Sequence, residues 1–471
     1  MRPREPEMHV HVPDPEVGWP QIPEEMVPVI ETMVGRLTET GSRSSMSAEI
    51  ENQLLTHVQE MIGAALKDPD RFGIVPAMAA RITADPKYRA LFTRAVLIRA
   101  SVLWPLSLLI YGGDYEEVRR LGGVWMVESG DGVKVLTGQE PPDFAATTIV
   151  NADKHIEEWF RGLLSMRGIV GVSGLSQAKP IVEAVVPSVI GPIRIAVAIA
   201  PVITGRSSIA CTIRIPRPNG PQSLDEFVAF GTMPGGVAKL LRASVLAQLN
   251  IVLAGGTGTG KTTLMRALAA EIPPNEFIVA IEDTAELQLD QPRRDGRPWH
   301  PRVISLSTVN AMWGGEVDAI EMQDLVRTAL RHRPHRILLG EARGPEMADA
   351  ASAMTSGHAG ALFTIHADSA VEALQRAAMY VAQSDAYRGD APGGRELVRQ
   401  AFQMCVHLGH RRNSRRRMVD GVAVYMPDGT PVNLYGVDDD GELIRMTENF
   451  EDLPSRVRKP LSRFINEIPA I

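Results

Sequence analysis

The segment QLNIVLAGGTGTGKTTLMRAL, at residues 248–268, constrains the possible folds more than any other part of this sequence. It begins with an apolar run, Ile251 to Ala254, which is typical of a buried parallel strand. A glycine-rich turn follows, and then a helix-forming segment, Leu264 to Glu271, which two prolines bring to an end. This order of strand, turn and helix predicts an α/β domain.

The turn matches the phosphate-binding P-loop pattern, and it consists of Gly255, Gly256, Thr257, Gly258, Thr259, Gly260, Lys261, Thr262 and Thr263. Glycines let the backbone curve tightly enough for its N–H groups to surround a phosphate, and the next helix adds the positive end of its dipole. Lys261 would reach the terminal phosphates, and the Thr262 hydroxyl would ligate Mg²⁺. A glycine-rich turn without a ligand is the alternative, but the complete pattern between strand and helix favours a nucleotide site.

The composition is that of a soluble globular protein. The 471 residues are enough for two or three domains, and the net charge of −7 argues against a broadly basic nucleic-acid-binding surface. Cys211 and Cys405 lie far apart, so neither a disulfide framework nor a cysteine-based metal site is expected. These features fit a reducing cytoplasm.

The first 47 residues are expected to form a disordered lead (1–47). They contain many prolines and acidic residues and lack the apolar core of a signal peptide. His9 and His11 could pair on a metal ion, but this composition favours a mobile tail.

Residues 48–105 are expected to form a helical extension, with a break between helices at Asp85-Pro86. The most membrane-like stretch, Ala95 to Tyr111, is interrupted by Arg99 and Pro105 and falls short of about 18 uninterrupted apolar residues. We therefore interpret it as a helix followed by a strand, both buried in protein.

Beyond the extension, the pattern changes to short strands around one helix, which predicts a smaller α+β domain. A segment rich in proline and glycine then reads as a linker to the P-loop domain. The expected boundaries are 106–216 for the α+β domain, 217–232 for the linker and 233–471 for the P-loop domain.

Three further apolar runs in the P-loop domain are expected to be strands, and they end at Glu282, Glu341 and His366. A doubly wound sheet places its ligand chemistry at the carboxyl ends of its strands, so these side chains are expected beside the P-loop. Strand-end acids are often caps or solvated turns, but three such ends in one domain favour a site. Glu341 holds the position of the acid that binds Mg²⁺ or its water shell.

His358 follows a predicted helix and Gly357, which is a natural left-handed cap. A lone histidine at such a place is more often structural, and for His366 the structural and functional interpretations both stay open. The two histidines lack the short ligand spacing of a zinc site.

Four blocks of sequence together resemble the secretion ATPase superfamily of type II and type IV secretion systems. The blocks are GGTGTGKTT, AIEDTAELQL, RPHRILLGEARGPE and TSGHAGALFTIHADS. They are similar, in the same order, to the Walker A, Asp box, Walker B and His box of that superfamily, which includes ATPases of pilus assembly and of conjugation. The resemblance is strong over residues 227–381 and weaker over 106–216, and it is closest to the tight-adherence pilus branch and its conjugation relatives.

The resemblance implies a homohexameric ATPase with a RecA-like C-terminal domain, docked on the cytoplasmic face of an inner-membrane secretion or pilus machine. It implies ATP and Mg²⁺ as cofactors and the platform proteins of that machine as partners. Nucleotide would bind between the N-terminal and C-terminal domains. No stable binding of nucleic acid is expected.

The resemblance also assigns roles to matching positions. Glu282 would polarise the attacking water, and Glu341 would organise Mg²⁺ through water. His358 and His366 would sense or orient the γ-phosphate.

Arginines of the N-terminal domain clamp the γ-phosphate in this superfamily, and Arg194 and Arg214 are the best matches here, with Arg206 as a third candidate. The alternative is an arginine on a solvated strand edge. Arginines from a second domain would couple hydrolysis to domain movement, because loss of the γ-phosphate removes the tie between the domains.

Two stretches depart from the superfamily. His335 stands where an acid is expected, which puts a local ion pair in doubt, and residues 291–315 match only loosely. Neither stretch touches the expected catalytic set.

Near the end of the chain, Met418 to Met426 and Val432 to Val437 predict a β-hairpin. The basic run before it, residues 410–417, could meet anionic lipid or nucleic acid, but an exposed loop is the preferred interpretation.

The favoured function is a mechanochemical ATPase that powers pilus assembly or protein secretion. A conjugative DNA-transfer ATPase would predict basic channel residues, and the net acidity weighs against it. A nucleotide-binding scaffold without turnover would need a missing catalytic acid, whereas Glu282 is present.

Overall fold

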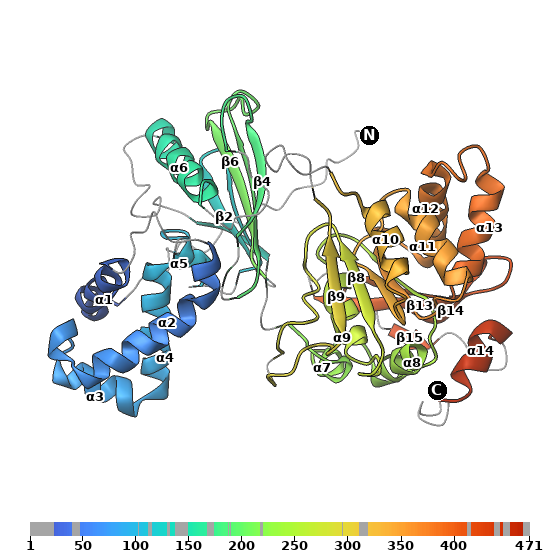
Figure 1. The fold of residues 1–471 in the computed structure, drawn as a ribbon, viewed down its shortest axis with the longest axis horizontal. Coiled ribbons are helices and arrows are strands. Elements are labelled where there is room, and N and C mark those ends of the chain that lie inside the picture. The colour runs from blue at the N-terminus through green and yellow to red at the C-terminus, as the bar shows by residue number, and fades with distance from the viewer. Residues whose placement is uncertain are drawn as a thin grey trace, which may run out of the picture. The chain divides into compact units, whose positions relative to one another are not determined.

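The computed structural model describes residues 23–39, 48–101, 103–111, 115–129, 132–136, 149–166, 174–186, 188, 190–216, 220–293, 295–309, 319–411, 416–437, 443–445 and 453–464. The chain divides near residue 218 into two compact units, here unit 1 and unit 2, which are described separately (Figure 1). Among the described residues, no helix combines the length and the apolar character that crossing a membrane requires.

Unit 1 contains helices followed by a six-stranded sheet. Its elements are η1 (Glu24–Met26), α1 (Val27–Glu39), α2 (Ala48–Lys67), η3 (Asp70–Phe72), α3 (Pro76–Ala84), α4 (Pro86–Ala100), α5 (Ser107–Ile110), β1 (Glu117–Leu121), β2 (Val124–Ser129), β3 (Gly132–Leu136), α6 (Ile149–Leu164), β4 (Ile181–Val186), β5 (Ile193–Ile199) and β6 (Ile209–Arg214).

Helix α1 lies inside the lead that was expected to be disordered, so that prediction is wrong for residues 23–39. Met26, Ile30 and Met33 recur at helical spacing and are almost fully buried. Packing of this apolar stripe stabilises the helix, whereas composition alone predicted disorder. The rest of the lead, with His9 and His11, lies outside the described residues.

The predicted helix break is confirmed at Asp85, whose carboxylate accepts hydrogen bonds from the backbone N–H groups of Lys87 and Tyr88 at the start of α4. The strand expected after this helix is wrong, because α5 forms there instead. All four residues of α5 are buried, and a short, mostly apolar run does not distinguish a buried strand from a buried helix.

The sheet of unit 1 is antiparallel, in the order β3-β2-β1-β6-β5-β4. Helix α6 is joined to the sheet by a buried ion pair, in which Arg120 Nη1 lies 2.7 Å from Asp153 Oδ1. One hydrophobic core includes both the helices and the sheet, so the helical extension and the α+β domain form one body.

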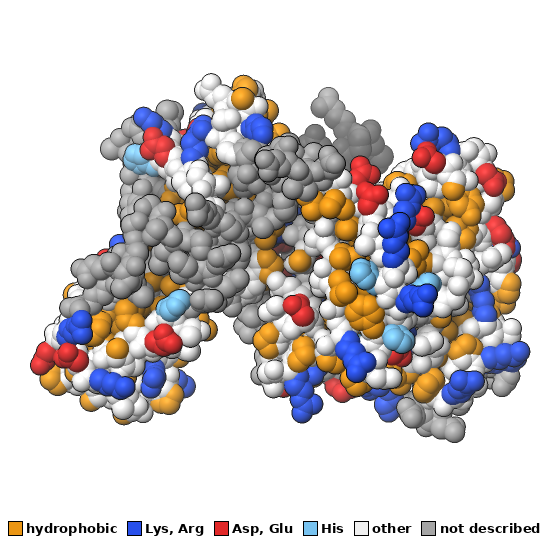
Figure 2. Space-filling view, in the orientation of Figure 1, with side chains coloured by type: hydrophobic (Ala, Val, Ile, Leu, Met, Phe, Trp, Pro, Cys, Tyr) orange, Lys and Arg blue, Asp and Glu red, His pale blue; other side chains and the backbone are white. Residues whose placement is uncertain are grey.

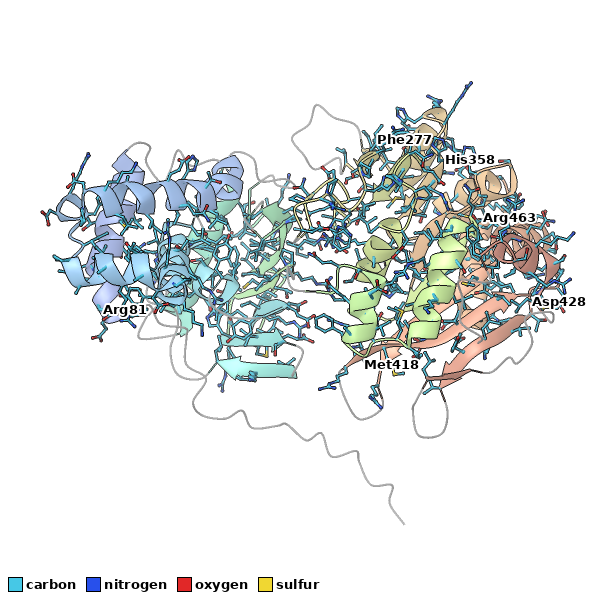
Figure 3. The ribbon with its side chains drawn as sticks, turned by 90° about the horizontal axis from the view of Figure 1, so that it is seen from below. Arg81, Phe277, His358, Met418, Asp428 and Arg463 are labelled. Atoms are coloured by element: carbon cyan, nitrogen blue, oxygen red, sulfur yellow. The ribbon has the colours of Figure 1, made fainter. Side chains whose placement is uncertain are left out.

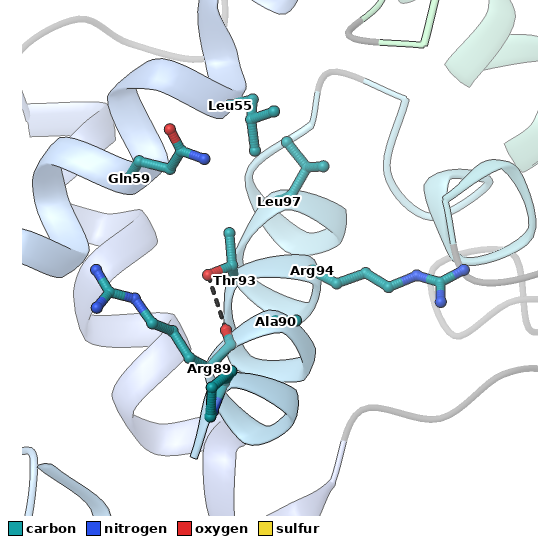
Figure 4. A pocket seen from close by; sticks show the side chains of 8 residues that line it. Leu55, Gln59, Arg89, Ala90, Thr93, Arg94 and Leu97 are labelled. Atoms are coloured by element: carbon teal, nitrogen blue, oxygen red, sulfur yellow. Dashed lines mark hydrogen bonds between the residues drawn. The ribbon is translucent and has the colours of Figure 1, made fainter. Parts of the chain in front are cut away.

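A groove of about 410 Å³ lies between α2 and α4, lined by Leu55, Gln59, Pro86, Arg89, Ala90, Thr93, Arg94 and Leu97 (Figure 4). None of the site residues predicted from the sequence lines this groove.

Unit 2 is built on a nine-stranded sheet. Its elements are α7 (Leu224–Ala229), α8 (Gly235–Leu246), β7 (Ile251–Gly255), α9 (Lys261–Ala269), β8 (Ile278–Glu282), β9 (Val303–Ser307), α10 (Met322–Arg331), β10 (Arg336–Leu339), α11 (Glu346–Thr355), β11 (Leu362–Ile365), α12 (Ala370–Gln383), α13 (Ala391–Ala401), β12 (Met404–His410), β13 (Arg417–Tyr425), β14 (Pro431–Val437), β15 (Leu443–Arg445) and α14 (Ser455–Leu461).

The strand order is β15-β14-β13-β12-β7-β11-β10-β8-β9, and the six strands from β12 to β9 are parallel. Helices α10 to α13 cover one face of the sheet, and α7, α8 and α9 cover the other (Figure 1). Each face therefore has its own hydrophobic core, as expected for a RecA-like α/β domain.

The predicted strands at β7, β8, β10 and β11 and the hairpin β13–β14 are confirmed. Strands β9 and β12 were not predicted. The linker was expected to extend to residue 232, but α7 begins at Leu224, and Leu224 and Phe227 are buried in the core of unit 2. The Ser223 hydroxyl, which accepts the N–H of Glu226, caps this helix.

Candidate nucleotide site at the carboxyl ends of the parallel strands

The glycine-rich turn connects the carboxyl end of β7 to the start of α9, in the middle of the parallel strands. Gly255, Gly258 and Gly260 have φ angles of 147°, 75° and 99°, a region that side-chain-bearing residues rarely adopt. A Cβ atom at Gly255 would collide with the carbonyl oxygen of Leu408 on β12. The backbone therefore has the conformation and the close packing that a phosphate-binding loop needs.

Lys261, the first residue of α9, directs its ammonium group back into this loop. Its Nζ donates hydrogen bonds to the carbonyl oxygens of Gly255, at 2.8 Å, and Gly256, at 2.7 Å. Burial lowers the pKa of Lys261 to about 8, although the carboxylates of Glu341 and Glu286 oppose this shift. A phosphate in the loop would supply the negative charge that this buried cation lacks.

Glu341 and His366 lie beside Lys261, as their strand-end positions predicted. His366 Nδ1 is 3.5 Å from Lys261 Nζ, and His366 Nε2 is 2.8 Å from Glu341 Oε1. Arg343 Nη2 donates to Glu341 Oε2 at 2.5 Å. Burial by itself would raise the pKa of Glu341, but Arg343 and the neighbouring cations hold it below its usual value. Burial and the charge of Lys261 lower the pKa of His366, which favours its neutral form.

Glu282 is at the predicted strand end, but the residue is only 4% exposed and its carboxylate turns toward the protein. It accepts backbone N–H groups from Glu286, at 3.0 Å, and Leu287, at 2.9 Å. Its side chain also packs over Gly340, where a Cβ atom would lie 2.7 Å from Glu282 Cγ. This carboxylate holds the chain that follows β8 in place.

Glu286 is exposed and accepts a hydrogen bond of 3.2 Å from the Thr262 hydroxyl. Sequence reasoning gave it no role, although it belongs to the block AIEDTAELQL. Sequence alone could not single out Glu286, because only the structure shows that Glu282 points into the protein while Glu286 points toward Thr262.

Thr262, Glu286 and Glu341 place side-chain oxygens beside the phosphate loop. Such groups fit Mg²⁺, which usually arrives with nucleotide phosphates and takes only one or two protein ligands. In the described part of the chain, no group of three or more His, Cys, Asp and Glu side chains forms a metal site by itself.

His358 does not join the other predicted residues. His358 precedes β11, and His366 follows its last residue. The first residue of β11 pairs with Ile251 at the start of β7. Because the strands are parallel, His358 lies at the amino edge of the sheet, and four residues of strand, about 13 Å, separate the two ends of β11. In Figure 3, His358 and Phe277 lie at one end of unit 2, and Met418, next to Arg417, lies at the opposite end.

Arg194 and Arg214 belong to unit 1, where they are direct neighbours across β5 and β6. Arg214 Nε donates to Glu117 Oε2 at 3.1 Å, and the Arg214 side chain is 54% exposed. Arg206 lies in the turn between these strands, at the other end of the hairpin, so it does not join this pair.

The site consists of a positive-φ glycine loop around a buried lysine. It lies at the carboxyl ends of parallel strands that carry an acid and a histidine. This combination defines a P-loop nucleotide-binding protein. The model of the family described as "Type II/IV secretion system protein" matches residues 180–419, which is more than half of the chain. The chain therefore belongs to the type II/IV secretion system protein family.

Individual relatives are similar over the same region. A putative conjugal transfer protein of Mycobacterium tuberculosis is 32% identical over 237 residues, which are 50% of this chain and 63% of that protein. The type IV secretion system protein PtlH of Bordetella pertussis is 39% identical over 198 residues, which are 41% of this chain and 54% of that protein. The chain thus spans less than two thirds of the length of each of these relatives.

Solved structures of related machines are also similar. The VirB11 ATPase of the Brucella suis type IV secretion system, in complex with sulphate, is 26% identical, with 68% of this chain and 95% of that chain covered and a TM-score of 0.34. The pilus retraction motor PilT with bound ADP is 16% identical, with 76% and 87% covered and a TM-score of 0.42. Because both TM-scores lie below 0.5, the family assignment rests on the sequence match.

Proposed function

We propose that this chain is an ATPase that hydrolyses ATP to power protein secretion or pilus assembly. The observation that carries the proposal is the contact chain from Lys261 through His366 to Glu341 beside a glycine loop. Phosphoryl transfer needs positioning and charge stabilisation more than covalent chemistry, and these residues supply both.

In the proposed mechanism, Lys261 and the loop N–H groups bind the terminal phosphates, and the Thr262 hydroxyl and Glu341 would hold Mg²⁺. Mg²⁺ would neutralise phosphate charge when it is bound with the nucleotide. The exposed carboxylate of Glu286 is the group suited to orient the attacking water, because it faces the Thr262 hydroxyl. Glu282 positions Glu286 by accepting a hydrogen bond from its backbone N–H. Neutral His366 connects Lys261 with Glu341 and reports the state of the γ-phosphate.

Substitutions of Glu286 and Glu282 distinguish this mechanism from one in which Glu282 polarises the attacking water. Glu286→Gln should reduce steady-state ATP turnover by at least about 100-fold while ATP binding persists. Glu282→Gln should lower the free energy of unfolding by about 1–3 kcal/mol, because a buried acceptor of two N–H groups is weakened. Loss of turnover in Glu282→Gln at unchanged stability, with Glu286→Gln fully active, would assign the water to Glu282.

For unit 1, we propose that Arg194 and Arg214 reach the γ-phosphate of a nucleotide bound to unit 2. Arg194 and Arg214 are directly opposite each other on β5 and β6, so their side chains leave the sheet on the same face. If Arg194→Ala and Arg214→Ala each left turnover unchanged, this role would be excluded. Arg206→Ala, at the other end of the same hairpin, is the matched control.

We further propose a homohexamer at the cytoplasmic face of the inner membrane, acting with membrane platform proteins. The mass of the wild-type protein in Mg²⁺-ATP, recorded beside its turnover, tests the assembly. A monomer that binds ATP and never turns it over, with or without membranes, would leave only a nucleotide-binding scaffold.

A conjugative DNA-transfer ATPase is the second candidate, because the mycobacterial relative is named a conjugal transfer protein. The visible face of unit 2 carries basic, acidic and apolar side chains intermixed, which is unlike a stripe for nucleic acid (Figure 2). Stimulation of turnover by single-stranded DNA, with strong salt dependence, would favour this candidate.

A further inference from the structure

The hairpin of β12 and β13 lies against the nucleotide site, although it is outside the four sequence blocks. Strand β12 is the parallel neighbour of β7, with Met404 opposite Ile251 and Leu408 opposite Gly255. The carboxyl end of β12 therefore lies beside the first residue of the phosphate loop. Strand β13 returns from there antiparallel to β12.

One contact joins this hairpin to the phosphate loop. Arg417 Nε, on the first residue of β13, donates a 2.6 Å hydrogen bond to the carbonyl oxygen of Gly258. The Arg417 Cδ atom also lies 3.6 Å from the position of a Cβ atom at Gly260. The carbonyl of Leu408 lies against Gly255, as described above. The hairpin therefore lies against the loop at all three of its positive-φ glycines.

A second contact joins the hairpin to the segment that carries His366. His407 Nδ1 is 2.5 Å from Asp420 Oδ1 on β13, and His407 Nε2 is 3.1 Å from the carbonyl oxygen of Ala367. Both oxygens accept hydrogen bonds, so only the doubly protonated imidazolium satisfies both contacts. Burial opposes this charge, but Asp420, the Ala367 carbonyl and the nearby carboxylate of Asp368 raise the pKa of His407.

We propose that the β12–β13 hairpin is a positioning element of the nucleotide site, in which Arg417 holds the phosphate loop and the Asp420–His407 pair holds the segment carrying His366. This inference rests on the proposed ATPase function. The carbonyl that His407 holds belongs to the residue directly after His366, and His366 contacts both Lys261 and Glu341.

The two contacts have separable consequences. A loop that is no longer held by Arg417 spends less time in the binding conformation, and the apparent Kd rises in proportion. Release of Ala367 leaves the loop intact and misplaces His366, so the chemical step is affected and binding is not. Arg417 thus acts on nucleotide affinity, and His407 acts on kcat.

The first test measures Kd for Mg²⁺-ATP and Mg²⁺-ADP, together with kcat, for Arg417→Met, Arg417→Lys and Arg411→Met. Arg417→Met should raise both Kd values about tenfold with kcat changed by less than about twofold. Arg417→Lys should recover much of the affinity, because an ammonium group can donate to the same carbonyl. The exposed Arg411, at the other end of the hairpin turn, is the matched control and should have wild-type affinity. Wild-type affinity in Arg417→Met would overturn this half of the proposal.

The second test is a double-mutant cycle between His407 and His366. His407→Gln and Asp420→Asn should each lower kcat about tenfold without changing Kd, and His407→Gln should have no further effect in a His366→Ala background. Additive effects would show that His407 does not act through His366 and would overturn this half.

The same measurements separate the two proposals. Wild-type protein that hydrolyses ATP, beside variants that match it in Kd and kcat, would overturn the positioning role alone. If the wild-type protein bound no nucleotide, both proposals would be overturned. If it bound nucleotide without turnover, the ATPase function and the proposed role of His407 would be overturned. The Kd values would still decide the proposed role of Arg417.

Discussion

The two edges of the parallel strands in unit 2 use polar side chains differently. At the amino edge, Asn250 accepts the N–H of Ala361 at 3.0 Å and donates to the carbonyl of Ala401 at 2.8 Å. There too, the buried Arg336 donates to Glu276 at 2.5 Å. These groups are buried and paired within the fold, as stable interiors require.

At the carboxyl edge, the charged side chains contact one another around a glycine loop and stay partly open to solvent. Glu282 and Lys261 are buried there, and burial lowers the pKa of Lys261 to about 8. Like a typical functional site, this edge holds shifted ionisable groups at some cost in stability. Substitutions at the amino edge should therefore change stability. Substitutions of the side chains that face the glycine loop at the carboxyl edge should change binding and turnover, whereas the inward-facing Glu282 should act on stability.

The largest expected effect at the carboxyl edge is that of Lys261→Met. It should reduce ATP turnover at least about 1,000-fold, because the main phosphate-binding cation is lost. The melting temperature should stay the same or rise, because a buried cation is removed. A clear fall in melting temperature would mean that Lys261 also supports the fold.

The largest expected effect at the amino edge is that of Arg336→Met. It leaves the carboxylate of Glu276 without its main partner, so the free energy of unfolding should fall by about 3–5 kcal/mol in urea titration. In folded protein, kcat and KM should change by less than about twofold. Arg388→Met, which breaks an exposed pair with Asp385, is the matched control and should cost less than about 1 kcal/mol.

The two histidines test the comparison directly. His366→Ala should lower kcat about 100-fold, because it removes the link between Lys261 and Glu341. His358→Ala, at the amino edge, should leave kcat within about twofold of the wild type, because His358 lies far from the loop. Equal losses of kcat in both variants would show that the amino edge also takes part in turnover.

The smallest expected effect is a pH dependence of nucleotide binding. Burial places the pKa of Lys261 at about 8, below its ordinary value of 10.5, so the free protein loses this proton as pH rises through 8. Affinity for ATP should then fall about tenfold per pH unit above pH 8, with one proton taken up on binding. Calorimetry in buffers of different ionisation enthalpy measures that proton. A Lys261→Met variant should lack it, and a flat wild-type profile from pH 7 to 9 would contradict the shifted pKa.

The parts of the fold that were predicted share a local origin. The β7–turn–α9 unit, the helix break at Asp85 and the hairpin β13–β14 all follow from patterns within about twenty residues. Helix α1 and α7 were missed because their apolar faces are short and only tertiary packing stabilises them.

The departure at His335 shows the same limit. Among the described residues, His335 forms no ion pair with a carboxylate but accepts the N–H of Phe277 through Nδ1 at 3.0 Å, and a different ion pair forms beside it between Arg336 and Glu276. Charge pairing across two parallel strands depends on register, which the order of residues along one strand does not reveal.

By itself, the sequence predicted a phosphate loop and placed Glu341 and His366 each after a strand, because patterns along the chain are sufficient for both. Only the tertiary structure decided that Glu282 turns inward while Glu286 faces Thr262, that His358 lies at the other edge, and that Arg417 reaches Gly258 from 159 residues away. The physical reason is that side-chain direction and strand order are set by packing of the whole sheet, and no local pattern contains them.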